Sequence, residues 1–184
     1  SGALLLVVGN ATAPAAQDLA LRTRFEAWGY TVSLIDDGDA ASAFTTAASS
    51  QDVAYVSGTV SDTTLGTKLT ALPIGVVSEE GALNDELGFA AGATTSVEVD
   101  LDVVDNSHYL TAAFVPGNVR IHDLPMRLSR VSGAEAAGLQ TLGNADGAGA
   151  LSVIEMGGLL SSGAAAAARR VKLPFDGVGG VNWD

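Results

Sequence analysis

Apolar runs and amphipathic stretches alternate along the first 80 residues. The apolar run 3–8 leads into a turn at Gly9-Asn10, an amphipathic stretch from 18 to 28 and a second apolar run at 31–35. Gly29 lies between the last two, where glycine commonly ends a helix. Strand, helix and strand in this order predict a βαβ unit, which opens a parallel sheet.

The same alternation continues to residue 77. It predicts further helices at 40–48 and 63–72 and strands at 52–57 and 74–77. Asp18 and Ser61-Asp62 stand where helix N-caps are expected. Four strands alternating with three helices make half of a doubly wound sheet, so we expect the parallel strand order 2-1-3-4. Ligand sites in such sheets lie beyond the carboxyl ends of the strands, here in the loops after Val8, Ile35, Val56 and Val77.

From residue 93 the apolar period changes to two. Residues 97–103 alternate apolar side chains with acids, which is typical of a strand with one solvated side. Further strands are predicted at 119–122, 126–131, 150–156 and 170–175, joined by glycine-rich turns such as the one at Gly143. We therefore predict one α/β domain over 1–184, with a βαβα parallel half (1–92) and a β-rich, antiparallel half (93–184).

The chain is acidic and contains no cysteine. Its 184 residues include 21 Asp and Glu against 9 Lys and Arg, a net charge of −12. This charge disfavours nucleic acid as a partner, and no apolar run is long enough to insert into a membrane. Without cysteine there is no thiolate nucleophile and no cysteine-ligated metal, and no motif indicates a cofactor.

The composition also bears on location. Ala, Gly, Thr, Ser and Val are abundant and Lys68 and Lys172 are the only lysines, which is typical of secreted, cell-surface or virion proteins. A GC-rich or salt-adapted genome produces the same bias, because charge balance reports on solubility rather than on role. We expect an extracellular, cell-surface or virion location, with the cytoplasm still open.

A few polar residues could line a ligand pocket at the strand ends: Asn10, Ser78, Glu79, Glu80 and His108. Ser78 or Glu79 would be the nucleophile, with His108 or His122 as the base that accepts its proton. The glycine pattern of a nucleophile elbow is missing, since Gly81 stands three residues after Ser78 and no glycine precedes it. The more ordinary interpretation is a solvated loop.

Metal binding has weaker support. The acidic cluster Glu98, Asp100, Asp102 and Asp105 offers the oxygen ligands that Ca²⁺ prefers. Alternation along a strand instead spreads these carboxylates over one face, so a solvated acidic face is the simpler interpretation. The two histidines do not have a zinc-binding spacing, and His108 is expected to orient a turn through backbone hydrogen bonds. We expect no resident metal.

Three segments in this order resemble a known superfamily. Gly29-Tyr30-Thr31-Val32 follows the first helix, Ser-His-Tyr-Leu-Thr-Ala-Ala-Phe occupies 107–114, and Arg-Arg-Val-Lys-Leu-Pro-Phe occupies 169–175. The chain looks like the class I glutamine amidotransferase-like superfamily, and resembles its trehalose-utilisation-type branch and the amidotransferase-like domains of bacterial surface and phage structural proteins. This resemblance implies a flavodoxin-like, three-layer α/β sandwich. Catalytic members carry a cysteine on the strand-to-helix turn, which here reads Val77-Ser78-Glu79-Glu80-Gly81, so the resemblance implies that amidotransferase activity is absent.

These features favour a non-catalytic structural or adhesive module of an extracellular or virion assembly, acting through protein contacts. The alternative is a hydrolase-like or carbohydrate-binding domain with a pocket at the strand ends. Because no segment after residue 92 has clear helical periodicity, one sheet face should lack cover. We therefore expect self-assembly or docking into a larger assembly through Leu173, Phe175, Val178, Val181 and Trp183.

Overall fold

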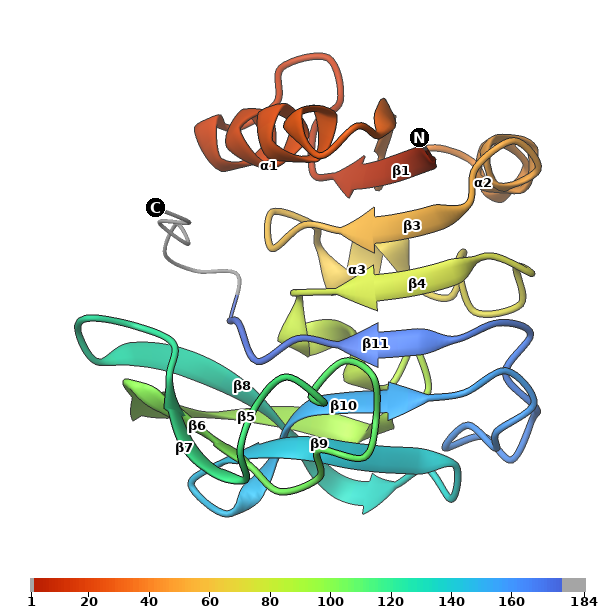
Figure 1. The fold of residues 1–184 in the computed structure, drawn as a ribbon. Coiled ribbons are helices and arrows are strands. Elements are labelled where there is room, and N and C mark those ends of the chain that lie inside the picture. The colour runs from red at the N-terminus through yellow and green to blue at the C-terminus, as the bar shows by residue number, and fades with distance from the viewer. Residues whose placement is uncertain (1, 177–184) are drawn as a thin grey trace.

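The computed structural model describes residues 2–176, and its N-terminal part is a parallel α/β unit. The elements are β1 (Ala3–Val8), α1 (Ala16–Ala27), β2 (Thr31–Asp36), α2 (Ala41–Ala48), β3 (Val53–Val56), α3 (Asp62–Leu65) and β4 (Gly75–Ser78). The four strands are parallel in the order β2-β1-β3-β4, which confirms the predicted order. Figure 1 shows α1 on one face of this sheet and α2 and α3 behind it.

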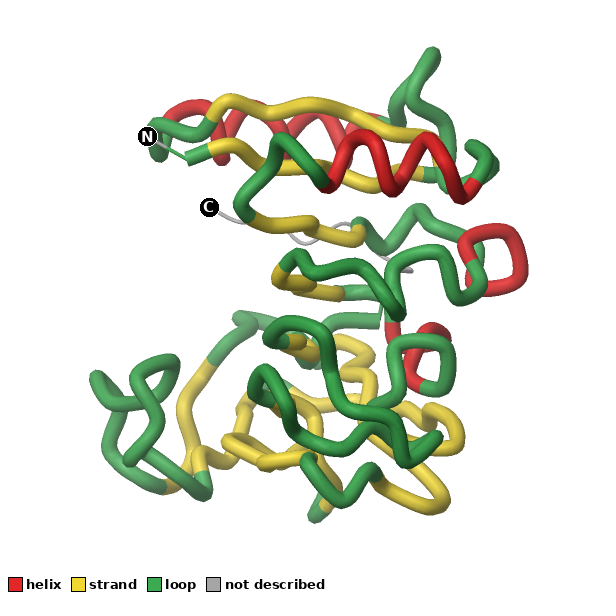
Figure 2. The backbone as a smooth tube through the Cα atoms, turned by 90° about the vertical axis from the view of Figure 1, so that its right-hand side faces the viewer, coloured by secondary structure: helices red, strands yellow, loops and turns green. Residues whose placement is uncertain are grey.

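The remainder is almost entirely β structure. After the 3₁₀ helix η1 (Gly81–Asn84) come β5 (Ala90–Glu98), β6 (Asp100–Val103), β7 (Gly117–Arg120), β8 (Met126–Glu135), β9 (Leu139–Ala145), β10 (Ala148–Ile154) and β11 (Arg170–Lys172). Five strands extend the sheet beyond β4, in the order β11-β10-β9-β6-β7, which makes nine strands in all, while β5 pairs with β8 separately. The antiparallel pairing expected after residue 95 is confirmed except at β11, which is parallel to β4. The α-helices gather around the N-terminal part of the molecule (Figure 2).

Two predictions for the parallel half are wrong in detail. The helix expected at 63–72 ends at Leu65, because Gly66 adopts a φ of 50° and turns follow. Asp18 is not the N-cap of α1, since that position belongs to Ala15. Asp18 lies three residues further on, and its carboxylate accepts the N–H of Ala15 at 3.2 Å.

Two predictions for the β-rich half are also wrong. The alternating stretch 97–103 is not one strand, because it divides between β5 and β6, which belong to different sheets. Gly143 is not a turn residue but lies inside β9, a strand that the apolar pattern missed. A Cβ at Gly143 would lie 2.9 Å from the Leu101 side chain, so the packing of Leu101 against β9 requires glycine at this position.

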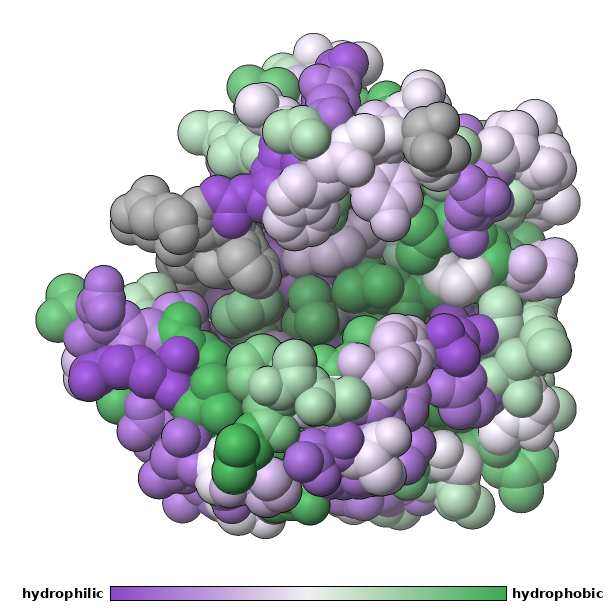
Figure 3. Space-filling model, in the orientation of Figure 1, coloured by the Kyte–Doolittle hydropathy of each residue, from purple (hydrophilic) through white to green (hydrophobic). Residues whose placement is uncertain are grey.

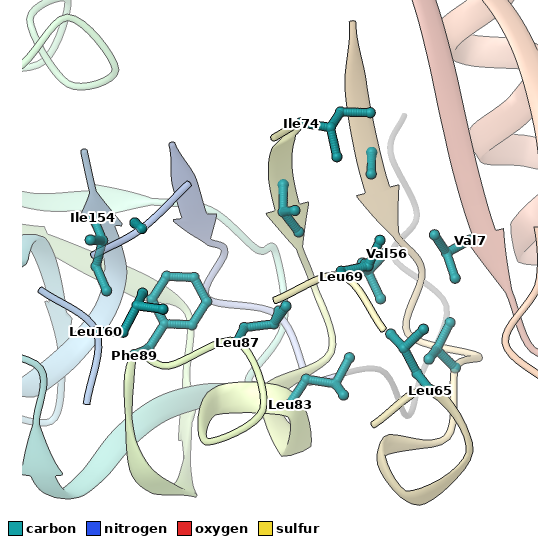
Figure 4. Packing of buried hydrophobic residues seen from close by; sticks show 14 of the residues in the cluster. Val7, Val56, Leu65, Leu69, Ile74, Leu83, Leu87, Phe89, Ile154 and Leu160 are labelled. Atoms are coloured by element: carbon teal, nitrogen blue, oxygen red, sulfur yellow. The ribbon is translucent and has the colours of Figure 1, made fainter. Parts of the chain in front are cut away.

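The two faces of the nine-stranded sheet have separate apolar cores. On the α1 face, meaning the face that α1 covers, Leu21 and Phe25 of the helix pack on β1 and on Tyr55 of β3. On the opposite α2 face, a larger cluster runs from Val7 to Leu160 (Figure 4). The β5–β8 pair packs on this second face. Among the described residues, no helix is long and apolar enough to cross a membrane.

A buried lysine joins the two sheets. The Lys172 side chain is 1% exposed, and its Nζ donates to the carbonyl oxygens of Ser129 on β8 (2.8 Å), Ala150 on β10 (3.2 Å) and Leu173 (3.2 Å). Among the residues that the structure describes, no carboxylate lies within ion-pair distance of Lys172 Nζ. Burial lowers the pKa of Lys172 to about 7, although the charges of Asp176 and Glu80 partly oppose this shift.

The lowered pKa predicts a pH dependence of stability. Between about pH 7 and pH 10.5, which is the usual pKa of lysine, the unfolded chain binds a proton at Lys172 that the folded chain does not. The free energy of unfolding should therefore rise as pH increases through this window. Urea unfolding at a series of pH values measures the slope. We expect Lys172→Met to flatten it and Lys68→Met, the control, to retain it. Equal slopes in all three proteins would contradict the assignment.

Candidate functional site at the carboxyl edge of the parallel strands

The loops after β1, β3 and β4 meet at one edge of the sheet. The chain passes from β1 to β2 on one side and then returns to β3 on the other, so the ends of β1 and β3 form a topological switch point, where ligand sites of such sheets are found. The two loops are in contact, because the N–H of Gly9 donates to Thr59 Oγ1 at 3.1 Å. Figure 1 shows these strands pointing toward the same edge.

Asp18 is the most buried acid at this edge, at 1% exposure. Its Oδ1 accepts hydrogen bonds from Ser57 Oγ (2.5 Å) and Thr59 Oγ1 (3.0 Å), while Oδ2 accepts from Ala15 N–H. Both hydroxyls belong to the loop after β3. The carboxylate therefore fastens the start of α1 to that loop, and every contact it makes is internal to the fold.

Glu79 is the second buried carboxylate, directly after β4 and 4% exposed. Its two oxygens accept from Tyr55 Oη (2.9 Å) and from the N–H of Gly58 (2.8 Å). Burial raises the pKa of Glu79, hydrogen bonds from Gly58, Tyr55 and Ser57 oppose this shift, and the nearby charge of Asp18 adds to it. Burial, together with the charge of Glu79, also raises the pKa of Tyr55. A carboxylic acid that holds its proton more tightly than usual can act as a proton donor.

Ser78 and Glu80 are engaged with the backbone. Ser78 is 2% exposed, and its Oγ both donates to the carbonyl and accepts from the N–H of Glu80, each at 3.2 Å. Glu80 Oε1 accepts the N–H of Ala82 at 2.8 Å and so caps η1. Burial raises the pKa of Glu80. A nucleophilic serine needs an exposed hydroxyl next to a base, and Ser78 has neither among the described residues.

Asn10 lies at the same edge but belongs to a turn. Its Oδ1 accepts from the N–H groups of Thr12 (3.0 Å) and Ala13 (2.9 Å) and from Thr12 Oγ1. This is the local pattern by which asparagine side chains close turns. The side chain is exposed, so its amide nitrogen points to solvent-accessible space near the switch point.

His108 does not join these residues. Its Nδ1 accepts the N–H of Leu110 at 3.2 Å, which confirms the expected turn role and leaves the proton on Nε2 for Glu155 Oε1 at 3.1 Å. Glu155 also binds Arg169 at 2.8 Å, and Arg169 precedes β11. This cluster therefore lies toward the amino end of β11, whereas Ser78 pairs with Lys172 at the carboxyl end.

The other candidate base, His122, packs against an aromatic ring. Its ring contacts Phe175 edge to face, with 5.9 Å between centroids. Burial lowers the pKa of His122, which favours the neutral imidazole. The ring therefore behaves as a packing residue.

The described residues contain no group of three or more His, Asp or Glu side chains arranged to hold a metal ion. Asp100 and Asp102 are paired across the strands with Arg120 and Asn118 of β7. Asp105 binds Ser107 and Gln140, and the hydrogen bonds from Ser107 lower its pKa. These carboxylates thus spread along β6 and the turn that follows it.

Sequence reasoning located the loops of this site but missed four of its members: Asp18, Tyr55, Ser57 and Thr59. The available signal was the Ser-Gly-Thr sequence after β3, where hydroxyls flank a glycine at a strand end. No family model matches the chain, and no curated protein is similar to it in sequence.

Removing the Asp18 carboxylate should destabilise the fold. Asp18→Ala leaves the buried hydroxyl of Ser57, the half-buried hydroxyl of Thr59 and the N–H of Ala15 without their acceptor, which we expect to cost about 2–3 kcal/mol. Chemical denaturation monitored by circular dichroism measures the loss. The control Asp123→Ala removes an exposed acid and should change the free energy of unfolding by less than about 0.5 kcal/mol. Equal effects of the two substitutions would refute this role of Asp18.

Ser78 should resist covalent labelling. Its hydroxyl is buried and bonded to the Glu80 backbone, so an activated fluorophosphonate has neither access to the oxygen nor a base to activate it. Intact-mass spectrometry after exposure to the reagent should show only the unmodified mass of each protein, for the natural chain as for Ser78→Ala. An adduct mapped to the peptide containing Ser78 would show that this is an enzyme site.

Proposed function

We propose that this chain is a non-catalytic structural or adhesive module of an extracellular or virion assembly, and that it works through protein contacts. The proposal is supported by how the polar groups at the carboxyl edge are used. The side chains of Asp18, Glu79, Ser78 and Glu80 all form hydrogen bonds within the fold itself. Of the two histidines that could have served as a base, His108 binds Glu155 toward the amino end of β11 and His122 packs on Phe175.

The observation that carries the proposal is an apolar strip on the α1 face. The helix α1 covers β1 and β3, and the segment 104–116 covers β9 and β10 through Leu110. Between these two covers lie β4 and β11. Val77 of β4 and Leu173, the residue after β11, belong to both neighbouring clusters and are half-buried. We call this strip the central groove, and Figure 3 shows a hollow with apolar surface across the middle of this face. An apolar sheet face without a helix above it is suited to cover by another protein.

Of the contact residues expected from the sequence, Leu173 lies in the central groove and Phe175 beside it. Phe175 is half-buried and forms an isolated antiparallel bridge with Leu128. Val178, Val181 and Trp183 lie outside the described residues. The parallel order β2-β1-β3-β4 supports the finer proposal that the N-terminal half derives from a flavodoxin-like, amidotransferase-like three-layer sandwich, in which the β-rich half has replaced the later helices.

A substitution in the central groove tests the proposed function. Leu173→Asn and Val77→Thr should weaken association in sedimentation velocity at increasing protein concentration, because they place polar groups where apolar surface would be buried. The control Met156→Asn changes an exposed apolar residue away from the groove and should have no effect. Thermal unfolding checks that all variants are folded. A natural chain that remains monomeric at every concentration and hydrolyses ester or amide substrates would refute the proposal.

A second candidate is a hydrolase-like or carbohydrate-binding domain, favoured by Glu79 alone. Its buried carboxyl group with a raised pKa stands at the end of a parallel strand, where catalytic acids are found. Titration calorimetry with an oligosaccharide panel tests this candidate. Binding that is lost in Glu79→Gln and kept in Glu98→Gln would favour it over the structural module.

A further inference from the structure

The two edges of the nine-stranded sheet differ in how they are protected. The edge strand β7 has four residues, follows Pro116 and begins at Gly117 with a φ of 119°. It ends at Arg120, whose side chain folds back to the carbonyl of His122 at 3.1 Å. Proline, short length and charge are the usual means of blocking an edge. The other edge strand, β2, has six residues and contains no proline, lysine or arginine.

Backbone groups of β2 point away from the sheet at alternate residues. Thr31 and Asp37 donate their N–H groups to the carbonyls of Gly2 and Val8, so the odd-numbered residues face β1. The even-numbered residues therefore direct N–H and C=O outward. Within residues 2–176, β2 pairs with β1 alone.

The outward N–H and C=O groups of Asp36 are already hydrogen-bonded within the chain. The N–H of Asp36 donates to Asp39 Oδ2 at 3.3 Å, and its carbonyl accepts the N–H of Asp39 at 3.0 Å. Val32 and Leu34 remain, each half-buried and each on the α1 face. The part of β2 whose outward backbone groups could pair with another strand is thus short, uncharged and centred on Ser33.

We propose that a second copy of this chain pairs with β2 in antiparallel fashion about a two-fold axis at Ser33. Val32 then stands opposite Leu34 of the second copy, and Leu34 opposite Val32, which gives four new backbone hydrogen bonds. Ser33 faces Ser33 in the close, non-hydrogen-bonded pair, and Thr31 faces Ile35. The two nine-stranded sheets join into one.

The occupant is a second copy because the strand is complementary to itself in this register. Opposed residues in a sheet must share a face, and Val32 with Leu34 satisfies this on the α1 face while Thr31 with Ile35 satisfies it on the other. No charged residue opposes another between 31 and 35. The exposed aromatic rings of Trp28 (64%) and Tyr30 (37%) stand just before β2 and would add contact area beside the pairing.

Charge determines how this contact responds to salt. Each copy carries a net charge of −12, so two copies repel over long range although the paired strands are neutral. Salt screens this repulsion, and the fraction of dimer should rise with ionic strength. A contact held by ion pairs would show the opposite trend.

Single cysteine variants test the pairing, because the natural chain has no cysteine. In the close pair the two Cα atoms at position 33 lie about 4.5 Å apart, within the range that a disulfide spans. Ser33→Cys should therefore form a covalent dimer under mild oxidation. The control Thr31→Cys is equally exposed, but its two copies lie about 13 Å apart along the strands and should remain monomeric.

A charge exchange provides the second arm of the experiment. Ser33→Lys and Ser33→Glu should each lose the dimer in sedimentation velocity, and an equimolar mixture should regain it as a heterodimer. Ser33→Cys should still form the covalent dimer when combined with Leu173→Asn, which separates this contact from the central groove. If Ser33→Cys does not form a disulfide, or if the mixture stays monomeric, the β2 contact is refuted while the proposed function stands or falls on its own test.

Discussion

The joint between the two sheets of this fold is centred on one amine. Lys172 Nζ supplies hydrogen bonds to three carbonyls on β8, β10 and the end of β11, where the backbone of one sheet crosses that of the other. An unpaired buried carbonyl is costly, and an uncompensated buried charge costs more. Burial lowers the pKa of the amine to about 7, so Lys172 loses its charge near neutral pH, and the neutral amine keeps two N–H groups to share among the three carbonyls. Arg170, two residues earlier, is also fully buried, and its Nη2 binds the carbonyls of Leu69 and Thr70.

At the carboxyl edge of the parallel strands, the buried charged groups are acids rather than a base, and hydrogen bonds within the fold again satisfy them. Asp18 and Glu79 are buried acids whose acceptor capacity is filled by hydroxyls and N–H groups of the loop after β3. Here they tie α1, β3 and β4 together, and the apolar surface available for contact lies instead on the sheet face, over β4 and β11.

Local periodicity accounts for what the sequence could predict. The apolar runs and the helix stop at Gly29 were sufficient for the order of the four parallel strands, because each βαβ unit is encoded over a short span. The strand β9 was missed because Gly143 is required by Leu101, a contact from another strand. The position of Glu79 at a strand end was predictable, but its partners Tyr55 and Gly58 were not, since the register of β3 against β4 brings them together.

The position of β11 has a consequence for how the chain folds. It is the last strand of the described residues, yet it lies in the middle of the sheet, parallel to β4 and antiparallel to β10. During synthesis β4 and β10 are complete well before their shared neighbour emerges, so each exposes an unpaired strand edge for that time. Contacts so distant in sequence also slow folding, because the connecting chain must first be ordered. Residues 170–172 therefore complete the sheet between β4 and β10, and chains interrupted before them would leave the facing edges of both strands unpaired.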